Sequence, residues 1–131
     1  MTSSIFSKII EREIPAYIID EDDDFIAFLD IHPLKKGHTL VVIKQQIDCF
    51  FTIDDNLLAK YIVFAKKIAT KIKSAIPCKR IAMSVVGLEV PHAHIHLIPI
   101  DNIGDVNFEK QHLSLSKQEM QTICDKIKHS V

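Results

Sequence analysis

The sequence is poor in glycine and carries no excess of charge of one sign. It has 3 glycines, 5 prolines, no low-complexity tract and no internal repeat, so one compact domain over residues 1–131 is expected, long enough to bury a single core. Acidic and basic residues balance at 17 against 16. Without a field of one sign, neither nucleic acid nor a membrane surface is an expected partner, and local groups must hold any polyanionic ligand.

Long apolar runs and paired cysteines are also missing. No apolar stretch approaches the roughly 20 residues that span a bilayer, and residues 1–6 show neither the basic start nor the apolar run of a signal peptide. The three cysteines, Cys49, Cys78 and Cys124, are odd in number, far apart and not at metal-ligand spacing. They indicate thiols in a reducing compartment, and we expect a cytoplasmic protein.

Hydrophobic periodicity predicts an antiparallel α+β domain with five strands. The longest helix, over residues 54–76, places apolar residues at spacings of three and four, with lysines on its other face. A capping box, Ser116 to Glu119, opens a C-terminal helix. The acidic run 21–24 is expected to be a solvated hairpin tip; a metal site is disfavoured because no glycine or further ligand follows at calcium-loop spacing. Strands are predicted at 17–19, 25–29, 39–43, 80–86 and 92–98, and the other helices at 4–12 and 116–129.

Three histidines alternate with apolar residues in the run 92–98, and this run is the most informative part of the chain. In a β-strand, side chains alternate between faces, so His92, His94 and His96 would share one face. Their apolar neighbours would point into the core. Imidazole rings that titrate near neutral pH suit the handling of phosphate and protons.

The residues alone leave three interpretations of this run open. Surface histidines without a task are disfavoured by the strict alternation. A zinc site is disfavoured by geometry, since alternate strand residues lie roughly 6.6 Å apart while Zn–N bonds are about 2.1 Å. Nucleophilic catalysis on phosphorus is the favoured interpretation, because a neutral imidazole can attack a phosphoryl centre and form an intermediate that water cleaves. His94, which alone has a neighbour on both sides, is the natural nucleophile.

The run 92–98 resembles the signature of the histidine triad (HIT) family of nucleotide hydrolases and transferases. The segments 4–15, 28–33 and 36–42 resemble further blocks of that family in the expected order. The resemblance is closest to the histidine-triad nucleotide-binding branch and implies a HIT-like fold: a five-stranded antiparallel sheet, one long central helix, and short N-terminal and C-terminal helices. It also implies a homodimer.

The same resemblance implies roles for individual residues. His94 would take the nucleotidyl group, His92 would orient its ring with His38 as a further link, and His96 would contact the phosphate and help expel the leaving group. Asp30 would accept hydrogen bonds from the ribose hydroxyls. Four apolar residues would line a slot around the purine, although packing in the core is their simpler interpretation: Phe6, Ile9, Ile14 and Ile31.

Two departures from the family pattern stand out. Many members carry Cys-x-x-Cys, with a structural zinc, where this chain has Ser4 and Ser7, so no metal is expected here. Before the first histidine, Leu88 replaces an amide and Glu89 a hydroxyl that would contact phosphate. The Glu89 carboxylate beside phosphate would repel it, unless it points away or meets a cationic leaving group.

These observations predict an enzyme that needs no cofactor. It would hydrolyse purine nucleoside phosphoramidates (AMP or GMP type) or adenylylated compounds through a covalent His94–nucleotide intermediate. One alternative is a nucleotide-binding or scaffold protein with little turnover, which Leu88 and Glu89 would favour. A weaker alternative is a dinucleoside polyphosphate hydrolase, which usually has more basic phosphate ligands than this chain offers; Lys35 and Lys36 are the only nearby candidates.

Overall fold

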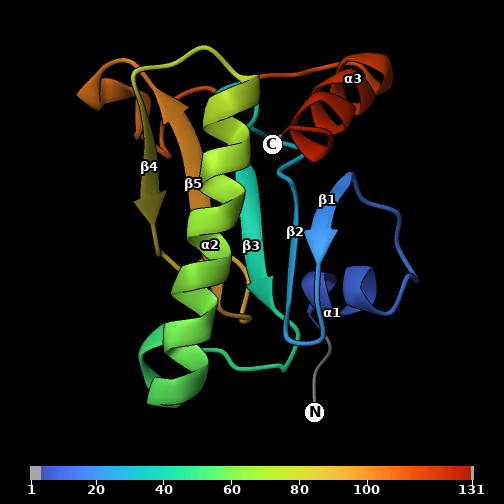
Figure 1. The fold of residues 1–131 in the computed structure, drawn as a ribbon, viewed down its shortest axis with the longest axis vertical. Coiled ribbons are helices and arrows are strands. Elements are labelled where there is room, and N and C mark those ends of the chain that lie inside the picture. The colour runs from blue at the N-terminus through green and yellow to red at the C-terminus, as the bar shows by residue number, and fades with distance from the viewer. Residues whose placement is uncertain (1–3, 131) are drawn as a thin grey trace.

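A five-stranded antiparallel sheet forms the centre of the molecule (Figure 1). The computed structural model describes residues 4–130. The strands are β1 (Ile18–Glu21), β2 (Phe25–Leu29), β3 (Thr39–Ile43), β4 (Arg80–Ser84) and β5 (His94–Ile100), in the order β1-β2-β3-β5-β4. The predicted α+β class is confirmed, and β5 lies between β3 and β4.

The long helix α2 (Asp55–Ala75) covers one face of the sheet (Figure 1). Asp54 caps its N-terminus, since the Asp54 carboxylate accepts a hydrogen bond from the Leu57 amide at 3.2 Å, and the helix ends two residues before Pro77. Its buried residues recur at spacings of three and four, which places them on one stripe. They are Tyr61, Phe64, Ala65, Ile68, Ile72 and Ala75.

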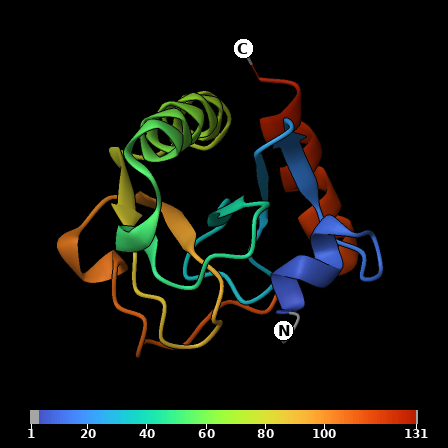
Figure 2. The same ribbon diagram turned by 90° about the horizontal axis from the view of Figure 1, so that it is seen from below.

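Two apolar clusters lie on opposite faces of the sheet. The larger one packs α2 and the C-terminal helix α3 (Lys117–Lys128) against Val41, Ile95 and Leu97. The smaller one packs the short helix α1 (Ile5–Ile10) against the other face and includes Phe6, Ile9, Ile26, Phe28, Leu40 and Val42. Figure 2 shows α1 and α2 on opposite sides of the sheet. Because side chains alternate along β5, His94 and His96 lie on the α1 side.

The structure differs from the sequence prediction at both ends of the histidine strand. The strand begins at His94, so His92 lies in the turn before it, with its amide bonded to the Val90 carbonyl at 2.8 Å. Pro99 lies within β5 instead of ending it. The pairing of β5 with β3 stops at Leu97, so beyond that point one edge of β5 is free and a residue without an N–H is tolerated.

The N-terminal helix is shorter than predicted, and the acidic turn is as expected. α1 ends at Ile10, five residues before Pro15, and Arg12 follows in the left-handed region with φ of 64°. The run Asp22–Asp24 joins β1 to β2, and Asp22 accepts hydrogen bonds from the amides of Asp24 and Phe25. No helix within residues 4–130 combines the length and apolar character needed to cross a membrane.

Candidate active site

His94 and His96 project from β5 into a site bounded by α1 and the loop between β2 and β3. Both are buried, with 5% and 9% of their surfaces exposed, and their ring centroids lie 5.0 Å apart. The Phe6 ring from α1 packs edge-on against His94 at 4.9 Å. The strand therefore presents the two rings side by side, held from one side by an aromatic wall.

A backbone carbonyl fixes the tautomer of His94. Its Nδ1 lies 2.7 Å from the carbonyl oxygen of His92, which can only accept, so Nδ1 carries the proton. Neutral His94 then has its lone pair on Nε2, which has no hydrogen-bond partner among the described residues. Among the described residues, every fully buried side-chain nitrogen or oxygen has a hydrogen-bond partner. Because His94 Nε2 has none, it is not fully buried and is reachable from solvent. The arrangement presents a nucleophilic nitrogen at the surface of the site.

His92 is fully buried and links the site to the N-terminal helix. Its Nε2 donates to the Ile43 carbonyl at 2.7 Å, so its Nδ1 accepts a hydrogen bond from the Ser4 hydroxyl, also at 2.7 Å. Ser4 in turn caps α1 by accepting from the Ser7 amide at 3.0 Å, and the Ser7 hydroxyl donates to Gln46. These contacts hold the turn whose carbonyl orients His94, so His92 acts on His94 through its backbone.

His38 pairs with His96 and not with the ring of His94. The Leu34 amide donates to His38 Nδ1 at 3.0 Å, so His38 carries its proton on Nε2 and donates it to His96 Nδ1 at 3.0 Å. Neutral His96 then holds its own proton on Nε2, as a free donor facing the site. Sequence reasoning placed His38 in the hydrogen-bonded chain; the structure places it on the His96 branch of that chain.

Asp30 lies beside the same pair, at the end of β2. Its Oδ2 is 3.6 Å from His38 Nε2, and its Oδ1 accepts from the His32 amide at 2.8 Å. Burial raises the pKa of the Asp30 carboxyl above its usual value. Oδ2 remains available as an acceptor for a ligand hydroxyl.

Asp30, His38 and His96 bring their ligand atoms within 4.8 Å of one another, which is close enough for a metal ion. The hydrogen bonds argue against one. His38 Nδ1 already accepts an amide proton, so a metal on Nε2 would require His38 to lose its remaining proton and become an imidazolate. The donor set fits a proton-holding pair better than a metal site.

The apolar residues predicted around the base divide into two groups. Phe6 and Ile9 are buried in the smaller core cluster, and Ile14 packs against it, so packing accounts for these three. Ile31 is 59% exposed and free to contact a ligand. Of the departures noted in the sequence, Leu88 is 88% exposed, and Glu89 is exposed in the loop before β5.

Sequence reasoning missed four residues that contact this site: Ser4 as the partner of His92, Gln46, Phe108 and His112. The Phe108 ring lies 4.7 Å from that of His96. Gln46 and Phe108 lie in segments without regular structure, where no periodicity marks them. Ser4 was marked in the sequence by its place at the start of a predicted helix and at a cysteine position of the family pattern.

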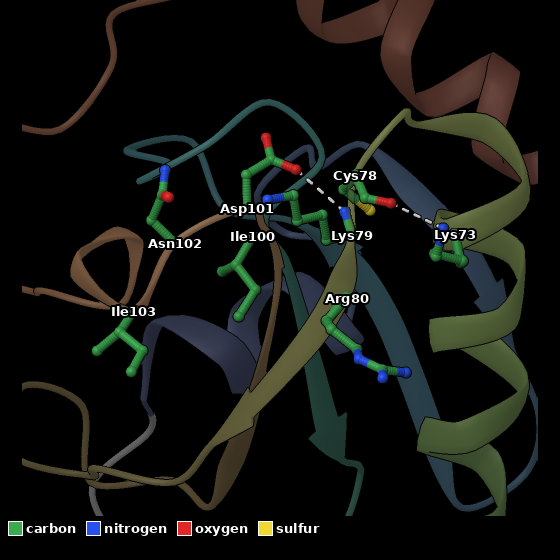
Figure 3. Close-up of a pocket in the computed structure, with 8 residues that line it drawn as sticks. All are labelled: Lys73, Cys78, Lys79, Arg80, Ile100, Asp101, Asn102 and Ile103. Atoms are coloured by element: carbon green, nitrogen blue, oxygen red, sulfur yellow. Dashed lines mark hydrogen bonds between the residues drawn. The ribbon is translucent and has the colours of Figure 1, made fainter.

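A pocket of about 530 Å³ lies at the opposite end of β5 and has no part in this site (Figure 3). Two hydrogen bonds join its lining residues: Lys73 Nζ donates to the Cys78 carbonyl at 2.7 Å, and the Lys79 amide donates to Asp101 at 3.0 Å (Figure 3). No histidine lines it. The histidines of the candidate site therefore lie away from this pocket.

Lowering the pH is expected to destabilise the fold through His38 and His96. Burial lowers the pKa of His38 to about 3 and that of His96 to about 4, from 6.5. Between pH 6.5 and 4 these histidines bind more protons in the unfolded chain than in the folded protein, so the free energy of unfolding falls as the pH falls. The full loss is about 1.4 kcal/mol for each unit by which the folded and unfolded pKa values differ. Urea unfolding of the wild type and His96→Gln at pH 7 and 5 measures the free energy of unfolding. An equal decrease in both proteins between pH 7 and 5 would contradict the contribution of His96.

Replacing Ser4 by alanine is expected to destabilise the protein more than the loss of an ordinary cap. A cap is worth about 1 kcal/mol, and leaving a buried acceptor such as His92 Nδ1 unpaired costs a further 1–3 kcal/mol, approximately. Ser116→Ala is the matched control, because Ser116 caps α3 through the Glu119 amide and lies at an exposed position. If Ser4→Ala and Ser116→Ala lower the free energy of unfolding equally, as measured with urea, the Ser4–His92 hydrogen bond contributes no stability beyond the helix cap.

Known proteins resemble this chain over most of its length. The HIT domain family model matches residues 11–103. An uncharacterised HIT-like protein of Borreliella burgdorferi is 35% identical over 89% of this chain and 91% of its own length, and protein hit of Bacillus subtilis is 36% identical over 77% and 73%.

Solved structures show the same relationship. A Hit-like protein from Bartonella henselae, described as involved in cell-cycle regulation and solved with an unknown ligand, superposes with a TM-score of 0.84 at 30% identity, covering 98% of this chain and 97% of that one. A HIT family member from Bacillus subtilis gives 0.75 at 30% identity over 96% and 95%. The chain thus belongs to the histidine triad (HIT) family.

Proposed function

We propose that this protein hydrolyses purine nucleoside phosphoramidates or related adenylylated compounds through a covalent His94–nucleotide intermediate. Membership of the HIT family supports the broader class, a nucleotide-binding hydrolase or transferase. The observation that carries the specific proposal is the state of His94: Nδ1 is fixed on the His92 carbonyl, and Nε2 is unpaired and reachable from solvent. Imidazole in this state is an activated nucleophile.

The first step forms one bond and breaks one. His94 Nε2 attacks the phosphorus, the bond from phosphorus to the leaving nitrogen breaks, and the leaving amine takes up the proton of His96 Nε2. His94 becomes positively charged, and the His92 carbonyl on Nδ1–H stabilises that charge, as a carboxylate does for the histidine of a hydrolytic triad. In the second step water attacks the phosphorus and returns a proton to His96 Nε2, the His94–phosphorus bond breaks, and the nucleoside monophosphate leaves.

His96, His38 and Asp30 complete the proposed site. His96 offers its Nε2–H to a phosphoryl oxygen or to the departing atom, and His38 keeps the proton on that nitrogen. Asp30 Oδ2 would accept from a ribose hydroxyl, and Ile31 would contact the base. The direct test is steady-state hydrolysis of adenosine 5′-phosphoramidate with release of AMP; nucleotide binding without release would favour a binding or scaffold role.

We also propose that two copies associate through β4 and the neighbouring surface of α2. β4 is an edge strand, and edge strands present unpaired N–H and C=O groups to a partner. Exposed apolar side chains on these elements include Ile62 on α2 and Met83, Val85 and Val86 on or just after β4. Sedimentation equilibrium of the wild type and Met83→Lys tests this; a monomeric wild type would contradict it.

A further inference from the structure

A segment without regular structure, residues 106–113, lies against the histidine site; we call it the cover segment. It runs across the lower side of the molecule in Figure 2, between the 3-10 helix Ile103–Asp105 and α3. Its Phe108 ring packs edge-on against His96 at 4.7 Å and lies 6.4 Å from His38. At its other end, the Leu113 amide donates to the Pro33 carbonyl at 2.8 Å. The segment therefore covers the His96 side of the site.

His112 fastens this segment with both nitrogens of its ring. Nδ1 lies 2.5 Å from the His32 carbonyl oxygen in the β2–β3 loop, and Nε2 lies 3.1 Å from the Phe108 carbonyl oxygen within the segment. A carbonyl oxygen only accepts, so both contacts require an N–H. Only the doubly protonated imidazolium has an N–H on each nitrogen.

The charges around His112 favour its cationic form. The two carbonyl hydrogen bonds raise the pKa of His112 above 6.5, and the carboxylates of Asp30 and Glu89 raise it further, while burial acts in the opposite sense. The positive charge of His112 also contributes to lowering the pKa of His38. Glu89, which sequence reasoning treated as a repulsive neighbour of phosphate, thus has a cationic neighbour in the cover segment.

We propose that doubly protonated His112 is a latch that fastens the cover segment and positions Phe108 against His96, and that the latch opens when His112 loses a proton. A neutral ring can donate to only one of the two carbonyls, so one fastening is lost, together with the attraction of Asp30 and Glu89. Any effect of the latch on the departure of a leaving group beside His96 rests on the proposed function. The latch itself does not, and it is tested without substrate.

The test uses a tryptophan reporter, because the chain contains no tryptophan. In Phe108→Trp, the emission is expected to change with a midpoint above pH 6.5 as the cover segment is released, separately from any change near pH 4, where His96 is protonated. Adding His112→Phe should abolish the upper transition. Adding His32→Gln should keep it, because His32 contributes only its backbone carbonyl to the latch.

Nitrogen-15 NMR of the histidine rings in the wild-type protein provides a second measurement that is independent of any variant's folding. The latch predicts that both His112 nitrogens are protonated at pH 6.5 and lose a proton only at higher pH. Titration of His112 at or below 6.5 would overturn the proposal, as would an upper emission transition in Phe108→Trp that survives the addition of His112→Phe. Neither result would bear on whether His94 is a nucleophile.

Discussion

Replacement of His94 by alanine is expected to lower the hydrolysis of a fluorogenic adenosine phosphoramidate by a factor on the order of 10⁴ or more. The reason is that His94 Nε2 is placed to attack phosphorus, whereas the proton on His96 Nε2 makes that nitrogen a donor. Steady-state kinetics on purified protein measure the loss. Calorimetric binding of AMP should persist, because Asp30 and Ile31 remain.

His129→Ala is the control for this variant. His129 is an exposed residue at the end of α3, so its loss should leave turnover unchanged. Urea unfolding of both variants separates lost chemistry from lost fold. Turnover that is unchanged in a folded His94→Ala variant would contradict the assignment of His94 as the nucleophile. If the wild type binds AMP but releases no product from any phosphoramidate, the binding or scaffold alternative becomes the better description.

Replacement of His96 by alanine is expected to slow the reaction by about 10²–10⁴ for a substrate with a poor leaving group. Such a leaving group needs a hydrogen bond or a proton as its bond to phosphorus breaks, and His96 Nε2–H is the donor that the His38 contact maintains. For an aromatic alcohol that leaves readily as an anion, the loss should be much smaller. Measuring kcat/KM with both substrates gives the comparison.

His38→Phe provides a parallel test of the same account. It removes the hydrogen bond that fixes the His96 tautomer while keeping an aromatic ring in the buried position. We expect the same dependence on the leaving group, with a smaller overall loss. If His96→Ala slows both substrates by the same factor, His96 does not act on the leaving group, and this assignment of its Nε2–H is contradicted.

Periodicity was sufficient to predict the elements that build the core. Alternation placed His94 and His96 on one face and Ile95 and Leu97 on the other, and the spacing of three and four in α2 marked its buried stripe. These patterns are local, because an amphipathic element must bury one face whatever it packs against. The family resemblance added the expected nucleotide chemistry and pointed to His38 and Asp30.

Contacts between distant segments could not be read from the sequence. The Ser4–His92 hydrogen bond joins residues 88 apart, and the His38–His96 bond joins residues 58 apart. The strand was expected to include His92, but the chain turns there, and the backbone carbonyl of that residue orients the His94 ring. Phe108 and His112 lie in a segment without periodicity, so only the packed structure shows that they reach the site.

The stereochemical course at phosphorus tests the central claim most directly. A substrate made chiral at phosphorus by isotopes of oxygen is hydrolysed by the wild-type protein, and the configuration of the product is determined. Two successive in-line displacements, first by His94 and then by water, each invert phosphorus, so the account predicts retention of configuration. Inversion would mean that water attacks the substrate directly, and it would contradict a covalent His94–nucleotide intermediate.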